Sequence, residues 1–180
     1  MYPLKGKIFE TILSKRGLGW SGGVNRLLLE GSASTYLALG HQWYSILSIG
    51  GQIKLPFEQP YFNTMAFGYG QHYLRGYEYY VIDGVAFFLA KADLKKKLLQ
   101  FQVPTFFKSK NYSTIPFTLY AKIYSGAGSV YSRKESLLGN KFLWTGGVGL
   151  DIVTIYDIAV SINFSFSNLG EKGIFFHASR

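Results

Sequence analysis

The chain has 180 residues, a net charge of +9, no cysteine, and a composition that is 18% aromatic but only 16% charged. The length suits a single domain, residues 1–180, with a buried core, and the lack of cysteine excludes disulfide bonds, cysteine-based zinc sites and thiol nucleophiles. Because soluble domains are typically about 25% charged, little of this surface is expected to face water. The positive charge admits nucleic acid or an anionic lipid surface as a partner.

The first elements are predicted to be strands at 6–16, 26–39 and 43–55. The uncharged stretch 31–53 is long enough for a membrane-spanning helix, which needs about 20 apolar residues. Polar residues interrupt this stretch, however, and Gly40-His41-Gln42 is typical of a turn, so a hairpin is favoured over a helix. The start of the chain shows no apolar signal-peptide core.

The second half of the chain continues the pattern, with strands predicted at 84–98, 117–124, 142–153, 156–167 and 172–178. The clearest is 156–167, where large apolar residues alternate with small polar ones, as in a strand with one apolar and one polar face. The total is about eight strands joined by Gly, Asn and Ser turns. Several have roughly the 9–11 residues that cross a membrane at a tilt.

The two faces of these strands distinguish a soluble protein from a membrane protein. In a soluble sandwich or ligand-binding barrel, the apolar faces would turn inward onto a core. The opposite faces here are small and polar with scattered charge, which suits a hydrated lumen. The apolar faces carry aromatic residues, several near strand ends, as in the girdles of membrane barrels: Trp43, Phe88, Phe142, Trp144, Tyr156, Phe164 and Phe166. We therefore predict an all-β fold, an antiparallel transmembrane β-barrel.

Motifs for other functions lack the context that they require. The segment 17–22 matches G-x-G-x-x-G, and Ser21 lies in a G-x-S-x-G arrangement, but a strand pattern follows where either motif needs a helix. A soluble enzyme using Ser21 is therefore only a third alternative. No catalytic or cofactor site is therefore predicted, and no metal site is predicted because no pair of the three histidines is at ligand spacing. Lys95-Lys96-Lys97 is interpreted as a solvated strand end at a membrane surface.

One connection is unusually long. Residues 56–83 separate the third and fourth strands, and connections beyond about 12–15 residues usually carry function or are disordered. This one is too aromatic for disorder. Its single arginine, Arg75, would be costly to bury in a barrel lumen unless a carboxylate of the wall pairs with it. We expect one ion pair to lock the loop.

The loop contains Leu74-Arg75-Gly76-Tyr77, followed by Glu78, and this segment resembles the V/I/L-R-G-F/Y motif of the BamA/TamA superfamily of outer-membrane insertases and translocators, the bacterial surface antigen family. The resemblance implies that Arg75 anchors the loop on an acidic residue of the inner wall, that Gly76 permits the turn and that Tyr77 packs beside it. Further segments resemble family elements in the same order: Tyr2 to Gly6, Pro56-Phe57, Tyr61-Phe62, Ser125 to Tyr131 and Gly146 to Leu150.

The sequence departs from the family pattern where the acid is expected. Gly126-Ala127-Gly128 stands in place of aspartate-x-glycine. Asp93 or Asp151, both predicted to face the lumen, must therefore pair with Arg75 if the lock exists. The last residues, 178–180, also lack the terminal aromatic residue common in such barrels.

The resemblance covers only the C-terminal half of the family's barrel, without its periplasmic domains. A closed barrel of eight strands fills its interior with side chains and would hardly hold the loop. An open half would expose strand edges to lipid, where each unpaired backbone group costs several kcal/mol. Either the loop stays outside a small barrel, or a second copy or another chain completes a larger one, which we favour.

The resemblance implies a non-enzymatic protein in the outer membrane of a Gram-negative bacterium, which assists the insertion or translocation of other outer-membrane proteins. A weakly paired seam, with the short strand 172–178 as its edge, would offer a template to a client strand. The expected partners are membrane lipids and lipopolysaccharide, client proteins and a second chain, with no nucleic acid and no cofactor. The alternative is a passive barrel or the membrane anchor of a larger protein, such as a patatin-type lipase.

Overall fold

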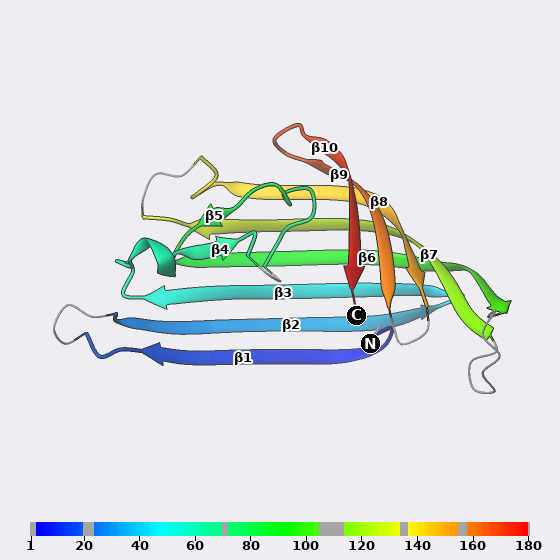
Figure 1. The fold of residues 1–180 in the computed structure, drawn as a ribbon, viewed down its shortest axis with the longest axis horizontal. Helices are drawn as coiled ribbons and strands as arrows, with labels where there is room; N and C mark the ends of the chain where they lie inside the picture. Colours follow the sequence, from blue (N-terminus) through cyan, green and yellow to red (C-terminus); the bar gives the residue numbers. More distant parts are fainter. Residues whose placement is uncertain are drawn as a thin grey trace.

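The structure of the protein is a computed structural model. It describes residues 3–19, 24–69, 72–104, 114–133, 137–154 and 158–179. Within these ranges eight antiparallel strands form one sheet, and each strand pairs with its neighbours along the chain (Figure 1). No helix in the same ranges is long and apolar enough to cross a membrane. The strands are β1 (Gly6–Arg16), β2 (Arg26–Gly40), β3 (Trp43–Leu55), β6 (Ala86–Pro104), β7 (Thr114–Tyr131), β8 (Phe142–Val153), β9 (Ala159–Ser167) and β10 (Lys172–Ser179).

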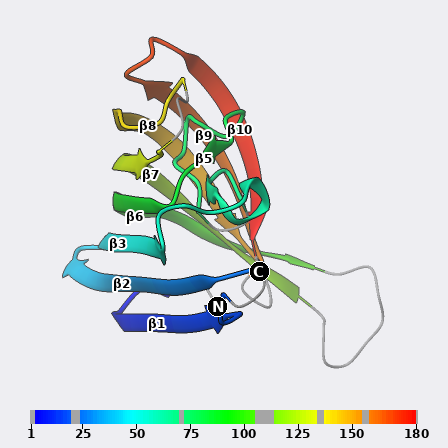
Figure 2. The same cartoon turned by 90° about the vertical axis from the view of Figure 1, so that its left-hand side faces the viewer.

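The predicted all-β fold is confirmed, but the described residues do not form a closed barrel. β1 and β10 are the two ends of the sheet, and no ladder between described residues joins them. The sheet is instead a curved, strongly twisted arc, in which β9 and β10 cross the other strands steeply (Figures 1 and 2). The long connection occupies the inner side of this arc.

The period-two pattern predicted the strands well, and the segments 6–16, 43–55 and 142–153 have the same bounds as β1, β3 and β8. The predicted turn before β3 is also confirmed. His41 and Gln42 have φ angles of 49° and 67°, the left-handed values that a two-residue type I′ hairpin requires.

The prediction was too short for the central pair, β6 and β7. Their ladder continues past the other strands as far as the pair formed by Pro104 and Thr114. Lys95–Lys97 consequently lie inside β6 and Lys95 is buried, so their placement at a solvated strand end was wrong, whereas a position at a membrane surface stays a prediction. The alternation itself continues, since Leu99, Phe101 and Val103 alternate with Gln100 and Gln102, but a register shift between Lys97 and Leu99 changes its phase. Residues 156 and 157 of the predicted strand 156–167 lie outside the described residues, and β9 begins at Ala159.

The registers place the side chains of the sheet on two chemically distinct faces. We call the side that carries the long connection the inner face and the opposite side the outer face. The inner face holds most of the charged and polar strand residues. On the outer face the large apolar side chains are exposed, reaching 78% for Phe9 and 72% for Phe176. They include Leu29, Leu37, Leu47, Ile49, Phe88, Leu94, Ile123, Trp144, Val148, Leu150, Phe164, Phe166 and Ile174.

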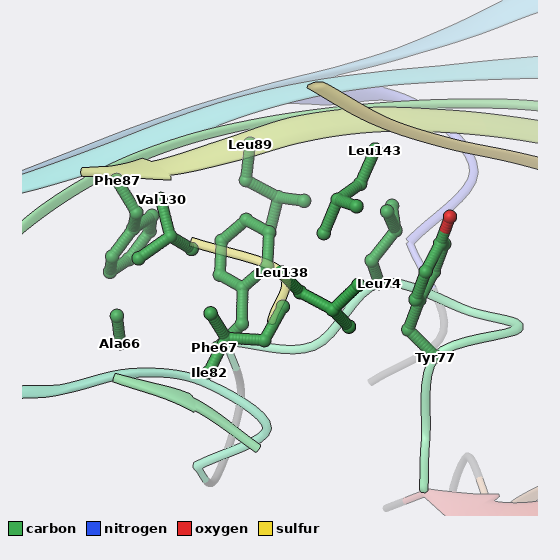
Figure 3. Packing of buried hydrophobic residues seen from close by; sticks show 10 residues of the cluster. All are labelled: Ala66, Phe67, Leu74, Tyr77, Ile82, Phe87, Leu89, Val130, Leu138 and Leu143. Carbon is green, nitrogen blue, oxygen red and sulfur yellow. The ribbon is translucent and has the colours of Figure 1, made fainter. Parts of the chain in front are cut away.

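The connection between β3 and β6 folds back over the inner face (Figure 2). It contains the 3-10 helix η2 (Tyr61–Asn63) and two short paired strands that were not predicted, β4 (Met65–Phe67) and β5 (Ile82–Asp83). Apolar residues close a small core between this loop and the sheet (Figure 3). They are Ala66, Phe67, Leu74, Tyr77 and Ile82 from the loop, Phe87, Leu89, Val130 and Leu143 from the strands, and Leu138 from the β7–β8 connection.

Candidate functional site

The candidate site is the inner face together with the loop that covers it, and Arg75 lies at its centre. The Arg75 guanidinium donates two hydrogen bonds to the Asp93 carboxylate on β6, from Nη1 to Oδ1 at 2.9 Å and from Nη2 to Oδ2 at 2.7 Å. The two side chains are only 18% and 8% exposed. A paired contact of this kind fixes orientation as well as distance. Of the two carboxylates proposed as partners of Arg75, the structure therefore brings Asp93 into contact.

Tyr124 on β7 forms the other side of the Arg75 environment. Cζ of Arg75 lies 4.6 Å from the centroid of the Tyr124 ring, within the range of cation–π attraction. The Tyr124 hydroxyl lies 2.5 Å from Oγ of Ser165 on β9. Because Asp93 and Tyr124 are directly paired in the β6–β7 ladder, adjacent strands present the carboxylate and the ring side by side to one guanidinium.

Asp151 on β8 has different partners. Its carboxylate accepts hydrogen bonds from Lys95 at 2.9 Å, from Lys122 at 2.5 Å and from the hydroxyl of Ser161 at 2.6 Å. The registers pair Tyr124, the neighbour of Asp93, with Gly147. Asp151 is therefore four residues further along β8, about 13 Å at the usual rise of a strand. That displacement separates it from Arg75 and leaves it to neutralise two buried lysines.

The glycines that replace the expected acid make room for the loop. A Cβ atom at Gly126 would lie 2.7 Å from Cδ1 of Leu74, and one at Gly128 would lie 2.7 Å from Cζ of Phe67. Both distances are shorter than a real Cβ atom tolerates. The loop therefore packs directly on the bare backbone of β7, and the acid that binds Arg75 comes from the next strand.

Each residue of the predicted motif contacts the inner face or supports the turn. Gly76 has a φ of 86°, a left-handed value that favours glycine, and a Cβ there would lie 2.7 Å from Oγ1 of Thr145. The Tyr77 N–H donates to the Leu74 carbonyl at 3.0 Å, which closes the turn. Leu74 and Tyr77 are both buried, and the Tyr77 hydroxyl bonds Asn168 in the β9–β10 turn.

Glu78 attaches the loop to the last strand of the sheet. Its Oε2 accepts the N–H of Gly76 at 2.6 Å, and its Oε1 lies 3.6 Å from Nε2 of His177 on β10. Burial raises the pKa of Glu78 above its ordinary value. The His177 ring also stacks on Tyr73 of the loop, with centroids 5.6 Å apart. Sequence reasoning missed His177, although its position in an alternating strand placed it on the polar face.

The loop is also attached to the strands at the opposite side of the arc. Nε2 of His72 lies 3.1 Å from Oε1 of Glu30 on β2, and Nζ of Lys54 on β3 donates to the carbonyl of Met65 at the start of β4. The loop therefore bridges the inner face from β2 to β10. It holds strands together that are not neighbours in the sheet.

The other candidate motifs contribute nothing to this site. Of the glycine-rich segment 17–22, residues 20–22 with Ser21 lie outside the described residues, as do Tyr2 and Arg180. Among the residues that are described, no group of His, Asp or Glu is arranged to hold a metal ion.

Comparison with known proteins gives no match of this chain to a family model, to a curated protein or to a solved structure.

Proposed function

We propose that this chain is a membrane-embedded part of an outer-membrane barrel of the BamA/TamA type, which assists the insertion or translocation of other outer-membrane proteins. The observation that carries the proposal is the distribution of side chains between the two faces: all eight strands expose large apolar residues on the outer face, and the buried charges lie on the inner face. Soluble monomers rarely expose contiguous apolar patches beyond a few hundred Å². If lipid hydrocarbon tails contact the outer face, its apolar side chains are not exposed to water.

The Arg75 contact supports the family assignment independently of the outer face. In the family that the motif resembles, the motif arginine pairs with an acid of the inner wall. Here the Arg75–Asp93 pair has that form, although the acid is on β6 instead of the Gly126-Ala127-Gly128 segment of β7. The glycine contacts with Leu74 and Phe67 supply a reason for this change.

In such a membrane the two ends of the sheet need partners. Unpaired backbone groups of β1 and β10 would cost several kcal/mol each in hydrocarbon. Closure of these eight strands on themselves would leave little interior space, and the loop already fills the inner side of the arc. Ile8 and Ile12, on the inner side of β1, are also exposed. Strands from a second copy or from another chain would complete a larger barrel and cover them.

A seam at β10 would serve the insertion of client proteins. β10 has eight residues, against 15 in β2 and 19 in β6, so a ladder along its edge has few hydrogen bonds and opens at low cost. An open edge pairs with an incoming strand by β-augmentation. Membrane lipids, lipopolysaccharide and unfolded outer-membrane proteins are the partners of this activity.

A passive barrel or a membrane anchor, for example of a patatin-type lipase, is the second candidate. The observation that favours it is the attachment of the loop at both sides of the arc, through Glu30 on β2 and His177 on β10. A loop that is attached to strands at both sides of the arc resists the opening of the strand edge that an insertase requires.

The deciding experiment reconstitutes the full chain into vesicles of bacterial phospholipid. Flotation measures membrane insertion, and the folding rate of a urea-unfolded outer-membrane barrel protein, followed by its heat-modifiable gel mobility, measures client handling. We expect the chain to float with the vesicles, to accelerate client folding, and to lose this acceleration in Arg75→Ala. Arg133→Ala, which removes an exposed pair with Glu58, is the matched control.

The outcomes separate the two parts of the proposal. A chain that remains in the aqueous fraction would contradict the membrane location. A chain that floats but leaves the client rate unchanged would contradict the insertase function and support the passive barrel.

A further inference from the structure

The outer face carries an apolar groove of about 470 Å³. This volume is within the range of roughly 300–1,000 Å³ that small-molecule sites occupy. The groove crosses strands β3 to β10, and its walls are almost entirely apolar. They are formed by Trp43, Leu94, Lys96, Ala121, Ile123, Val148, Leu150, Ile162, Phe164 and Ile174, with backbone contributions from 122 and 149.

The groove exists because one small outer-face residue, Ala121, lies between larger ones. Ala121 on β7 pairs with Lys96 on one side and with Leu150 on the other, so its short side chain leaves a depression between two long ones. Ile123, the next outer-face residue of β7, is 60% exposed and forms a wall. An occupant of this depression would contact methyl and methylene groups along its length.

A single cation lies at the rim of the groove. The neighbours of Lys96 in the chain, Lys95 and Lys97, alternate to the inner side of β6, whereas Lys96 points to the outer face beside Trp43. Its Nζ lies 5.1 Å from the centroid of the Trp43 ring. No carboxylate among the described residues forms an ion pair with it. The apolar groove therefore has one positive end without a negative partner in the described chain.

The position of Lys96 along the sheet corresponds to a membrane surface. The N–H of the following residue, Lys97, donates to the carbonyl of Gln42 in the β2–β3 turn at 2.9 Å. Two-residue hairpins and the rings of tryptophan lie at the interface between lipid and water, and lysine extends its ammonium toward that interface while its methylenes cover apolar surface. From Lys96 the groove runs across the outer faces of β7, β8 and β9 to Ile174 on β10.

We propose that this groove binds one phospholipid with an anionic head group, whose acyl chain lies over Ala121 and whose phosphate contacts Lys96. The inference rests on the membrane location proposed above and adds a specific lipid site to it. Charge complementarity selects an anionic lipid, because the ammonium of Lys96 attracts anionic head groups at the interface. The apolar walls select an acyl chain over a polar ligand.

The test uses brominated lipids as fluorescence quenchers, since Trp43 is in the wall of the groove. Trp20→Phe with Trp144→Phe leaves Trp43 as the reporter, and Trp20→Phe with Trp43→Phe leaves Trp144, which is on the outer face but outside the groove. Each full-length chain is inserted into phosphatidylcholine vesicles that contain a minor fraction of either dibrominated phosphatidylglycerol or dibrominated phosphatidylcholine. Flotation confirms insertion of every variant before quenching is measured.

We expect phosphatidylglycerol to occupy the site at Trp43 with an affinity about fivefold above that of phosphatidylcholine, and both lipids to quench Trp144 equally. Lys96→Gln should remove the preference at Trp43 without removing quenching. Ala121→Leu should reduce quenching of Trp43 by both lipids, because it fills the depression. Lys172→Gln and Ala90→Leu, which change outer-face residues that do not line the groove, should leave the signal unchanged.

Each contrary result has a distinct meaning. Equal quenching of Trp43 by the two lipids would overturn the anionic site and leave ordinary surrounding lipid. Quenching of Trp144 without quenching of Trp43 would show that protein covers the groove, from a second copy or another chain, and would also overturn the proposal. A chain that does not float, and whose tryptophans neither lipid quenches, would instead contradict the membrane location itself.

Discussion

Removal of either partner of the Arg75–Asp93 pair should destabilise the protein strongly, and removal of both should cost less than the sum. The pair is bidentate, with distances of 2.9 and 2.7 Å, and the two side chains are 18% and 8% exposed. Truncation of one partner of such a buried pair leaves the other charge desolvated and costs about 3–5 kcal/mol. Asp93→Ala and Arg75→Ala are each expected in this range.

The double variant separates the pair interaction from the desolvation of its members. Because Arg75→Ala with Asp93→Ala leaves no unpaired charge, the coupling energy of the cycle should be about 1.5–3 kcal/mol. The free energy of unfolding is measured by urea titration of the chain in vesicles, followed by tryptophan fluorescence and extrapolated to water. Arg133→Ala provides a control, since the Arg133–Glu58 pair is 59% and 74% exposed and exposed pairs contribute below about 1 kcal/mol.

The result that would refute this reasoning is additivity. If the two single losses sum to the loss in the double variant, Arg75 and Asp93 act independently and the loop has some other anchor. A loss for Asp93→Ala no larger than that for Arg133→Ala would have the same meaning.

Three further predictions concern the packing of the loop on Gly126, the Asp151 carboxylate and the pH dependence of stability. Gly126→Val should cost about 1–3 kcal/mol of unfolding free energy, because its added carbons would overlap Leu74. Gly31→Ala should be nearly neutral in the same urea titration, because its Cβ would make only an ordinary contact, 3.9 Å from the Glu10 carbonyl oxygen. Asp151→Ala should cost about 3–5 kcal/mol, more than truncation of either lysine that contacts it, since two buried cations would then face each other. Burial raises the pKa of Glu78 above 4.5, so its contribution to stability is complete below that pH and is lost as the pH rises through the raised pKa. Glu78→Gln should remove this part of the pH dependence; an unchanged profile between roughly pH 4 and 8 would show that Glu78 does not titrate in that window.

The alternation of side chains determined the strands and the chemistry of their faces. A strand turns successive side chains to opposite sides, so the pattern of 43–55 is readable without any knowledge of its neighbours, and β3 has those bounds. Turn chemistry is equally local, since the conformation of His41 and Gln42 depends on two residues and the twist beside them. The sequence likewise indicated that Arg75 would need a carboxylate, because the cost of burying a guanidinium holds in any fold.

The choice of partner depended on the tertiary structure. Asp93 and Asp151 occupy equivalent positions in alternating strands, and only the registers of β6, β7 and β8 show that four residues along the sheet separate their levels. The same registers placed Gly126 beneath Leu74. In the sequence, Gly126 to Gly128 stood out only because the expected acid is absent there, whereas in the structure the segment makes room for the loop. That no ladder between the described residues joins β1 to β10 was likewise visible only in the tertiary structure. Alternation along a strand is set by backbone geometry within a few residues, whereas contacts across a sheet are set by register, curvature and the volume left by distant side chains.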